Sequence, residues 1–165
     1  MPPPITATAC ANIAFIKYGG NRSGGDNLPL NPSISTTMSG CVTTTTVALL
    51  SGGSDEIVLG GSPAEPKAYE RTVRYLDRIR RIACRSDAAR VTSSNSFPTG
   101  CGIASSASGF AALATASAAA YGLRADARAL SRLARLGSGS AARSLFGGFV
   151  ELRPGLRHEE SYAEQ

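Results

Sequence analysis

Residues 95–107 combine the residue types and the spacing that a phosphate-binding turn requires. A strand-like segment leads into a turn with one proline and two glycines, and two serines then open an alanine-rich stretch typical of a helix. Glycine lets the backbone approach a phosphate closely, and the free N–H groups at a helix start attract its negative charge. A serine hydroxyl can bind a phosphate oxygen or a Mg²⁺ ion. The residues expected to take part are Pro98, Gly100, Gly102, Ser105 and Ser106.

The same segment also has a purely structural interpretation, as an ordinary helix start rich in glycine and serine. It is not a P-loop, because the G-x-x-x-x-G-K-[ST] order and its lysine are missing. Composition alone leaves phosphate binding and a plain helix start both open.

A second candidate for chemistry is Lys17, which ends an apolar strand-like run within residues 11–22. Its ammonium group would lie at the end of a sheet, where it could lower the pKa of a hydroxyl or hold a carboxylate. The alternative is a lysine at a strand end that only extends its charge toward solvent.

A third segment, residues 137–144, is a glycine-serine turn that opens another helix and carries Arg143 one turn later. The backbone N–H groups of such a turn can hold an anion, and an arginine can bind a carboxylate or phosphate through two parallel hydrogen bonds. A plain connection between two helices remains the alternative for this segment.

The elements that must position these residues are read from residue types and turn signals. Strands are expected at residues 6–18, 33–38, 42–50, 57–59, 90–96 and 149–153. The strands at residues 42–50 and 57–59 are expected to form an antiparallel hairpin closed by a longer loop. Helices are expected after Pro66, from the serine pair to Gly122, and from Asp126 to Gly137. The predicted class is α+β, a mostly antiparallel sheet backed by helices on one side.

Positive charge is concentrated in residues 67–90, which contain eight basic and only three acidic residues. The net charge of the whole chain is +5. One interpretation is a surface for nucleic acid or another anionic partner. The favoured one is the solvated side of an amphipathic helix, because apolar residues recur at three- and four-residue spacing and no nucleic-acid motif accompanies the charge. That apolar stripe comprises Tyr69, Val73, Leu76, Ile79 and Ala83.

Composition excludes several other classes. The 165 residues are 42% hydrophobic and 18% charged, which is a globular composition of one-domain size. The four cysteines contain no C-x-x-C pair, which argues against a zinc site and a disulfide framework. No secretory signal is recognisable, and residues 109–122 are too rich in small residues for a membrane span, so a cytoplasmic protein with free thiols is expected.

Taken together, the three segments and residues 28–35 resemble the mevalonate diphosphate decarboxylases of the GHMP kinase superfamily in order and spacing. The phosphate-binding turn matches that of the superfamily. The resemblance implies an N-terminal half with the fold of ribosomal protein S5 domain 2, ATP and Mg²⁺ as cosubstrates, and a phosphorylated mevalonate as substrate. In that family ATP phosphorylates the tertiary hydroxyl, and the phosphate leaves as CO₂ is lost, giving an isopentenyl phosphate for isoprenoid biosynthesis.

Carried over residue by residue, the resemblance assigns three catalytic positions. Lys17 would stand near the reacting hydroxyl, Arg143 would orient the carboxylate, and Ser106 would contact the ATP phosphates and Mg²⁺. The substrate-binding residues implied are Tyr18, Gly19, Gly20, Asn21, Ser138, Gly139, Ser140, Ala141, Ala142 and Arg143.

Two departures from the family concern the substrate phosphate. The family has Tyr-Trp-Gly-Lys where this chain has Tyr18-Gly19-Gly20-Asn21, and eukaryotic members tend to have arginine where this chain has Ser62. With two cations fewer, mevalonate 5-phosphate is a candidate alternative to the diphosphate, although Arg22 could compensate.

A third departure concerns the general base. The family's Asp-Ala-Gly-Pro-Asn motif is absent, so residues 1–165 are interpreted as a truncated N-terminal domain that is inactive alone. An unpaired sheet edge would then favour aggregation or a homodimer. A mevalonate-type kinase that does not decarboxylate and a non-catalytic ATP-binding fragment are the remaining alternatives.

Overall fold

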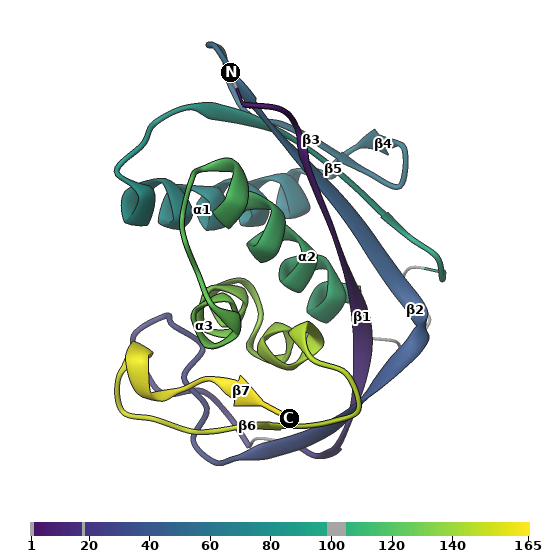
Figure 1. The fold of residues 1–165 in the computed structure, drawn as a ribbon, viewed down its shortest axis with the longest axis vertical. Coiled ribbons are helices and arrows are strands. Elements are labelled where there is room, and N and C mark those ends of the chain that lie inside the picture. Colours follow the sequence, from purple (N-terminus) through teal and green to yellow (C-terminus); the bar gives the residue numbers. More distant parts are fainter. Residues whose placement is uncertain (1, 18, 99–104) are drawn as a thin grey trace.

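The computed structural model describes residues 2–17, 19–98 and 105–165, which form one sheet with helices packed on it (Figure 1). In chain order the elements are β1 (Ile5–Ile16), β2 (Ser33–Leu50), β3 (Glu56–Leu59), β4 (Ser62–Pro63), α1 (Pro66–Ala83), β5 (Ala88–Asn95), α2 (Ser105–Ala120), α3 (Ala127–Gly137), the 3₁₀ helix η1 (Gly139–Leu145), β6 (Phe149–Leu152), the 3₁₀ helix η2 (His158–Glu160) and β7 (Ala163–Glu164). The predicted α+β class is confirmed.

The long strand β2 organises the sheet, whose order is β4-β3-β5-β2-β6-β7 with β1 paired to β2. β1 runs antiparallel along most of β2, while β5 pairs with residues 43–50 and β6 with residues 33–36 of the same strand. The two strands expected at 33–38 and 42–50 are therefore one continuous strand. The pairing of β1 with β2 shifts register between Cys10, which pairs with Val42, and Ala11, which pairs with Met38. The residues of β2 between Met38 and Val42 are accommodated at this irregularity.

The expected antiparallel hairpin of residues 42–50 and 57–59 is wrong. β3 pairs in parallel with β5 and antiparallel with β4, so β5 lies between β3 and β2. Asp55 supplies the physical reason, because its carboxylate accepts a hydrogen bond from the backbone N–H of Ala89 (2.8 Å) and forms a salt bridge with Arg80. These contacts anchor the start of β3 to the start of β5.

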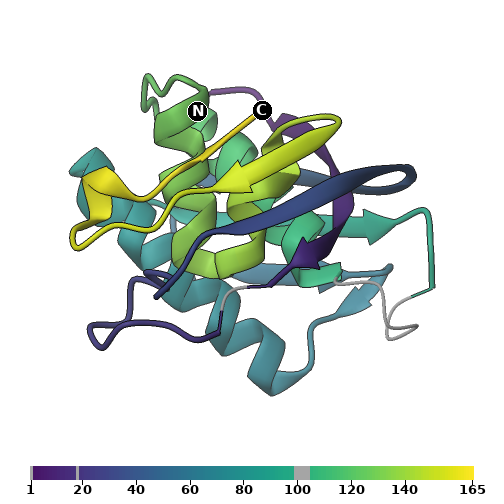
Figure 2. The same cartoon turned by 90° about the horizontal axis from the view of Figure 1, so that it is seen from below.

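The three α-helices gather on one side of the sheet, as the sequence predicted (Figures 1 and 2). α2 is buried along most of its surface and consists almost entirely of Ala, Ser and other small residues. Small side chains allow it to lie close to the sheet and to its helical neighbours, which confirms the predicted buried helix. Within the described part of the chain, none of the helices has the length and apolar character that crossing a membrane demands.

Helix α1 begins with Pro66 and ends at Ala83, and the left-handed backbone of the next residue, Cys84 (φ 52°), caps the last turn. Leu76 and Ile79 of the predicted apolar stripe are fully buried, and Tyr75, which the stripe did not include, is buried with them. The helix and its amphipathic character are confirmed, although its inner face also takes in Tyr75.

The arginines of α1 do not all lie on a solvated face, which corrects the sequence interpretation. The side chain of Arg80 is only 11% exposed and forms salt bridges with Asp55 and Asp77. Burial on its own would lower the pKa of Arg80, but the hydrogen bonds to Asp55 and Asp77 outweigh it and raise the pKa. Arg80 is thus a structural residue that joins α1 to the sheet.

The predicted cap of α3 is confirmed, since the Asp126 carboxylate accepts a hydrogen bond from the backbone N–H of Ala129 (2.7 Å). The helix ends at Gly137, whose close approach to Phe110 leaves no room for a side chain, because a methyl group there would overlap the ring. The helix expected from residues 137–144 is a 3₁₀ helix, η1, and the strand expected at 149–153 is β6.

Strand β1 forms one edge of the sheet, and within the described residues it pairs with β2 alone. Ile13, Phe15 and Ile16 on this strand are each about half exposed or more, and the Phe15 ring lies 6.0 Å from that of Phe149 on β6. The C-terminal end of β1 and the neighbouring part of β6 therefore carry exposed apolar side chains.

Candidate functional site

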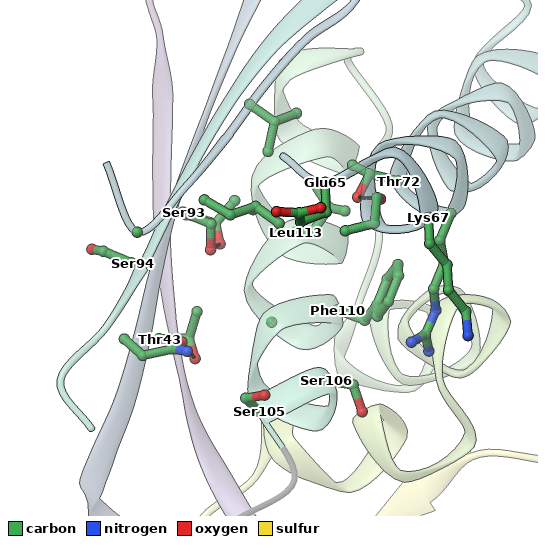
Figure 3. Close-up of a pocket in the computed structure, with 18 of the residues that line it drawn as sticks. Thr43, Glu65, Lys67, Thr72, Ser93, Ser94, Ser105, Ser106, Phe110 and Leu113 are labelled. Atoms are coloured by element: carbon green, nitrogen blue, oxygen red, sulfur yellow. Dashed lines mark hydrogen bonds between the residues drawn. The ribbon is translucent and has the colours of Figure 1, made fainter. Parts of the chain in front are cut away.

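A cavity of about 810 Å³ lies between the sheet and the first turns of α1 and α2 (Figure 3). One part of its wall is apolar, with Val91, Leu113 and Phe110 among its residues. Figure 3 shows Ser105 and Ser106 at one end of the cavity and Glu65 and Leu113 toward the other. An apolar compartment that leads to hydroxyls at a helix start suits a nucleotide, with its base in the first part and its phosphates in the second.

The predicted serines form the polar end of this cavity. Ser105 and Ser106 lie in the first turn of α2, which has no acidic residue that would repel a phosphate. Behind them the Thr43 hydroxyl is hydrogen-bonded to the side chains of Asn95 (2.7 Å) and Ser108 (2.6 Å), which fixes the sheet against the helix start. Pro98 is described and exposed, whereas Gly100 and Gly102 lie outside the described residues.

Two cations of α1 line the same cavity, although this side of the helix was expected to face solvent. Lys67 and Arg71 are separated by one helical turn, and both border the cavity. Figure 3 shows Lys67 extending beside Phe110. Because burial disfavours the charged form and Arg74 repels it, the pKa of Arg71 is lowered. The missed signal was the spacing of four residues, which places both cations on one side of the helix.

Arg143 occupies a second, buried site between η1 and the ends of β1 and β2. Only 2% of its surface is exposed, and its guanidinium donates hydrogen bonds to Ser33, Ser35 (2.9 Å) and Asn12 (3.3 Å). The Asn12 amide in turn donates to the backbone carbonyl of Ser140 (3.1 Å) and to the Ser144 hydroxyl (2.7 Å). We call this set, Asn12, Ser33, Ser35, Ser140, Arg143 and Ser144, the Arg143 network.

The predicted glycine-serine turn lies directly against this network. The Ser138 and Ser140 hydroxyl oxygens are 3.3 Å apart, and Gly139, Ala141 and Ala142 are buried without bulky side chains. Ser131 of α3 secures the turn from behind, because its hydroxyl donates to the carbonyl of Ala142 (3.2 Å). The turn therefore presents hydroxyls beside a fixed guanidinium, which suits a carboxylate or a phosphate.

The residues predicted around Lys17 form a loop held by asparagine side chains. Lys17 is exposed, and its backbone carbonyl accepts from Asn31, whose side chain also accepts from the N–H of Gly19 (2.7 Å). Asn21 donates to Asn27 (3.4 Å), and the loop also includes Gly20, whose φ of +145° favours glycine. Tyr18 lies outside the described residues.

This loop reaches the glycine-serine turn through Asn27. The Asn27 amide donates to the backbone carbonyls of Arg135 (2.8 Å) and Leu136 (3.3 Å), the last residues before Gly137. The loop that carries Asn21 is thus tied to the chain that leads into Ser138. The structure brings together two segments that the sequence separates by more than 100 residues.

The cavity shares a wall with the glycine-serine turn that lies against the Arg143 network. The Arg71 guanidinium lies 4.6 Å from the centre of the Phe110 ring and donates a hydrogen bond to the carbonyl of Gly137 (2.9 Å). Phe110 lines the cavity on one side and packs against Gly137 on the other. Arg71 and Phe110 therefore join the candidate nucleotide site to the turn that contains Ser138 and Ser140.

Among the described residues, no group of three or more His, Cys, Asp and Glu side chains could hold a metal ion. The prediction that the Ser106 hydroxyl binds Mg²⁺ stays a prediction.

Comparisons with known proteins agree with this geometry. A model of the diphosphomevalonate decarboxylase-like N-terminal domain matches residues 9–163. Diphosphomevalonate decarboxylase mvd1 of Aspergillus fumigatus is 41% identical over 178 residues, which cover 97% of this chain and 44% of that protein. The chain therefore spans less than half the length of this relative.

Solved structures agree as well. The crystal structure of mevalonate diphosphate decarboxylase from Staphylococcus aureus has a TM-score of 0.94 at 41% identity, covering 98% of this chain and 49% of that one. A structure described as MDDEF in complex with MVAPP, AMPPCP and magnesium has a TM-score of 0.92 at 42% identity, covering 98% and 50%. The resemblance inferred from the motifs is confirmed, and the chain belongs to the family of diphosphomevalonate decarboxylase-like N-terminal domains.

Proposed function

We propose that this chain provides the ATP-binding and substrate-binding residues for the ATP-dependent decarboxylation of a phosphorylated mevalonate. Three features support the proposal: membership of the family, the cavity with hydroxyls at the start of α2, and the buried Arg143 network. The relatives matched are decarboxylases of mevalonate diphosphate by name, and one neighbouring structure contains an ATP analogue and magnesium.

The cavity residues fit ATP with Mg²⁺. Ser105 and Ser106 would bind phosphate oxygens, and Ser106 would also contact Mg²⁺. Lys67 and Arg71 would balance the phosphate charge from the opposite wall. When bound, ATP supplies the phosphoryl group that converts the tertiary hydroxyl of the substrate into a leaving group. The cavity residues would bind and orient ATP, and the apolar part of the wall would exclude water.

The Arg143 network fits the carboxylate end of mevalonate. The hydrogen bonds from Arg143 to Ser33, Ser35 and Asn12 fix the guanidinium before any ligand arrives. A fixed cation can orient a carboxylate and restrain its rotation, so that carbon–carbon cleavage begins from one geometry. Ser138 and Ser140 would bind the same substrate, and Lys17 would stand near the reacting hydroxyl.

The observation that joins these features and carries the proposal is the wall that Arg71 and Phe110 form between the cavity and the glycine-serine turn. Phosphoryl transfer from ATP to mevalonate requires the two ligands to lie side by side, and Arg71 and Phe110 join the two sites at Gly137. Two unrelated pockets would have no need of such a connection.

Two substrates are proposed, which differ in the number of phosphate groups on mevalonate. The 5-diphosphate is the substrate in the names of the relatives, whereas the replacement of a cation by Asn21 keeps the 5-monophosphate as an alternative. Ser62, at the second replaced position, is exposed on β4. Comparing kcat/KM for the two substrates decides between them, and a clear preference for the diphosphate would remove the alternative.

Two further proposals concern the state of the protein. We propose a cytoplasmic location, which is supported by the free thiols of Cys10, Cys41 and Cys84. We also propose a homodimer formed through the apolar edge of β1, where Ile13 and Phe15 are exposed. A monodisperse monomer in size-exclusion chromatography with light scattering would contradict the dimer.

The experiment that tests the function measures ADP and CO₂ together, after incubation of the chain with ATP, Mg²⁺ and mevalonate 5-diphosphate. Equal amounts of both products support decarboxylation, and ADP without CO₂ would show the mevalonate-type kinase instead. If neither product forms, calorimetric titration with Mg²⁺·AMPPCP and with mevalonate 5-diphosphate tests the binding function directly. Failure of both ligands to bind would overturn the proposal.

A further inference from the structure

A second hollow, of about 410 Å³, lies beside α1 where the helix faces the end of α3. Four arginines of α1 line it, together with Leu136 and Gly137 of α3. We call this hollow the arginine groove. Its arginines are Arg71, Arg74, Arg78 and Arg81.

The spacing of these arginines places them in one stripe along the helix. Steps of three and four residues bring side chains to the same side of an α-helix, so the four guanidinium groups converge on one groove. Few carboxylates accompany them. Arg78 pairs with Asp26 (3.2 Å), and the one acid that lines the groove, Asp77, pairs with Arg80 (2.8 Å).

The remaining arginines of the groove have no acidic partner within the described residues. Arg71 donates to the carbonyl of Gly137, and Arg81 donates to the backbone carbonyl of Asp77 (3.1 Å). Neither these two nor Arg74 forms a salt bridge with a described carboxylate. The repulsion from Arg74 lowers the pKa of Arg71 in addition to the effect of burial. An anion bound between them would relieve this repulsion.

We propose that the arginine groove binds the phosphate group of a small phosphorylated ligand. A planar guanidinium donates two parallel hydrogen bonds to a phosphate, and several arginines can share its oxygens. A diphosphate would use more of the available donors than a monophosphate.

The position of the groove suggests two sources for this phosphate. Arg71 lines both the groove and the nucleotide cavity, and Gly137 is followed directly by Ser138 of the substrate turn. The terminal phosphate of the mevalonate substrate could reach the groove, and its arginines would then replace the cation missing at Asn21. That assignment rests on the proposed function. A free inorganic diphosphate is the other source of the same chemistry.

A nucleic acid is a poorer match for this stripe. Nucleic-acid binding needs a row of exposed cations that follows an extended phosphate backbone. Here Arg78 is held by Asp26 and by the carbonyl of Gly25 (3.0 Å), and the arginines border a recess that Leu136 and Gly137 close on one side. A recess of this size suits one phosphate group or two.

The test uses inorganic pyrophosphate as the probe and calorimetry on the 165-residue chain in buffer without Mg²⁺. The variant R74Q/R81Q removes two groove cations that do not line the nucleotide cavity. The matched control R85Q/R90Q removes the same charge from exposed arginines outside the groove, which pair with Asp87 and Glu56. Thermal melting establishes that both variants remain folded.

We expect R74Q/R81Q to weaken pyrophosphate binding by at least about tenfold, because charge-assisted hydrogen bonds are lost, and R85Q/R90Q to weaken it by less than about threefold. Equal losses in the two variants would show a general charge effect and overturn the proposal. Absence of pyrophosphate binding to the folded wild-type chain would overturn it as well.

A second pair of titrations identifies the source of the phosphate. If the substrate supplies it, R74Q/R81Q weakens mevalonate 5-diphosphate binding and leaves the affinity for unphosphorylated mevalonate unchanged. If free anions supply it, pyrophosphate binding falls while both mevalonate compounds bind as before. Wild-type titration with AMPPCP checks the proposed function separately, because failure of the nucleotide to bind would not alter the pyrophosphate result.

Discussion

The nucleotide cavity and the Arg143 network meet at one wall, yet they are built in opposite ways. The cavity is open, with an exposed lysine and hydroxyls at a helix start, so the proposed attraction for phosphate would come from charges that solvent can reach. The Arg143 guanidinium is 2% exposed and is fixed by neutral hydroxyl and amide groups from β1 and β2.

This difference has an energetic consequence. An exposed cation is screened by water and salt, so an exposed cavity residue such as Lys67 contributes modestly to affinity and little to folding. A buried charge and its buried hydrogen-bond partners depend on one another, so the loss of one leaves the others unsatisfied. Substitutions in the Arg143 network should therefore affect folding and substrate binding together, whereas substitutions of Lys67, Ser105 or Ser106 in the cavity should affect nucleotide binding alone.

The largest effect is expected from Arg143→Gln. The change leaves Ser33, Ser35 and Asn12 without their buried donor, so the free energy of unfolding should fall by about 2–4 kcal/mol. Affinity for mevalonate 5-diphosphate should fall by about 100-fold, the loss of two charge-assisted hydrogen bonds, while AMPPCP affinity changes by less than about threefold. Urea unfolding and calorimetry measure the two quantities. If the folded variant loses affinity equally for mevalonate 5-diphosphate and AMPPCP, the two sites do not differ in the way proposed.

A smaller effect on stability, but one shared by both sites, is expected from Gly137→Ala. The added methyl group would overlap the Phe110 ring, and the required shift should cost about 1–3 kcal/mol of stability. Because Phe110 and Arg71 form the shared wall, both ligands should bind more weakly. Gly147→Ala is the control, since its added methyl group would meet nothing within 4 Å. A loss confined to one ligand would show that the wall does not connect the sites.

The double change Ser105→Ala with Ser106→Ala should act on the nucleotide alone. AMPPCP affinity should fall by about 5- to 30-fold, as expected for two hydrogen bonds of about 1 kcal/mol each, with little change in melting temperature. The exposed Ser86→Ala serves as control. Unchanged AMPPCP affinity would mean that the phosphates bind elsewhere in the cavity.

The smallest effect concerns pH and the support behind the substrate turn. Arg135 is fully buried, and its guanidinium lies 3.1 Å from Nδ1 of His158; burial first, and then this cation, lowers the pKa of His158. Because the unfolded chain takes up the proton more readily than the folded one, stability should be complete above the ordinary histidine pKa and fall as the pH drops below it.

The decrease in melting temperature between pH 7.5 and pH 5.5 should be on the order of a few degrees. It should be smaller in His158→Asn, whose amide oxygen can accept from Arg135 without titrating. The other charged groups that face His158 are Asp26, Glu159 and Arg132, and they remain in both proteins. The same pH response in the wild type and the variant would exclude His158 as the source.

The sequence was sufficient for the helices and most strands because their signals are local. Pro66, Asp126 and Gly137 mark helix ends by their own backbone chemistry, wherever the helix lies. Strand pairing was mispredicted because it depends on distant contacts. No local signal shows that Asp55 will bind Arg80 and Ala89, and it is this contact that places β3 beside β5.

For the candidate site, the sequence indicated Ser105, Ser106 and Arg143 through motifs, but not the residues that support them. Asn12 lies in an apolar run, and Ala11 and Asn12 are both buried next to the irregular pairing of β1 with β2. Because successive side chains of a regular strand point to opposite faces of the sheet, one of these two would be expected on the solvent-facing side. Arg71 was assigned to solvent because the orientation of α1 above the cavity is a property of the whole fold.

The most direct test of the account is whether the two ligands occupy the chain at the same time. Mevalonate 5-diphosphate should be titrated calorimetrically into the 165-residue chain, first alone and then with Mg²⁺·AMPPCP at saturation. We expect one substrate molecule per chain in both titrations, with affinity maintained or increased when the nucleotide is present. Substrate binding that is abolished by the nucleotide would show a single shared site and would contradict the arrangement of two adjoining sites.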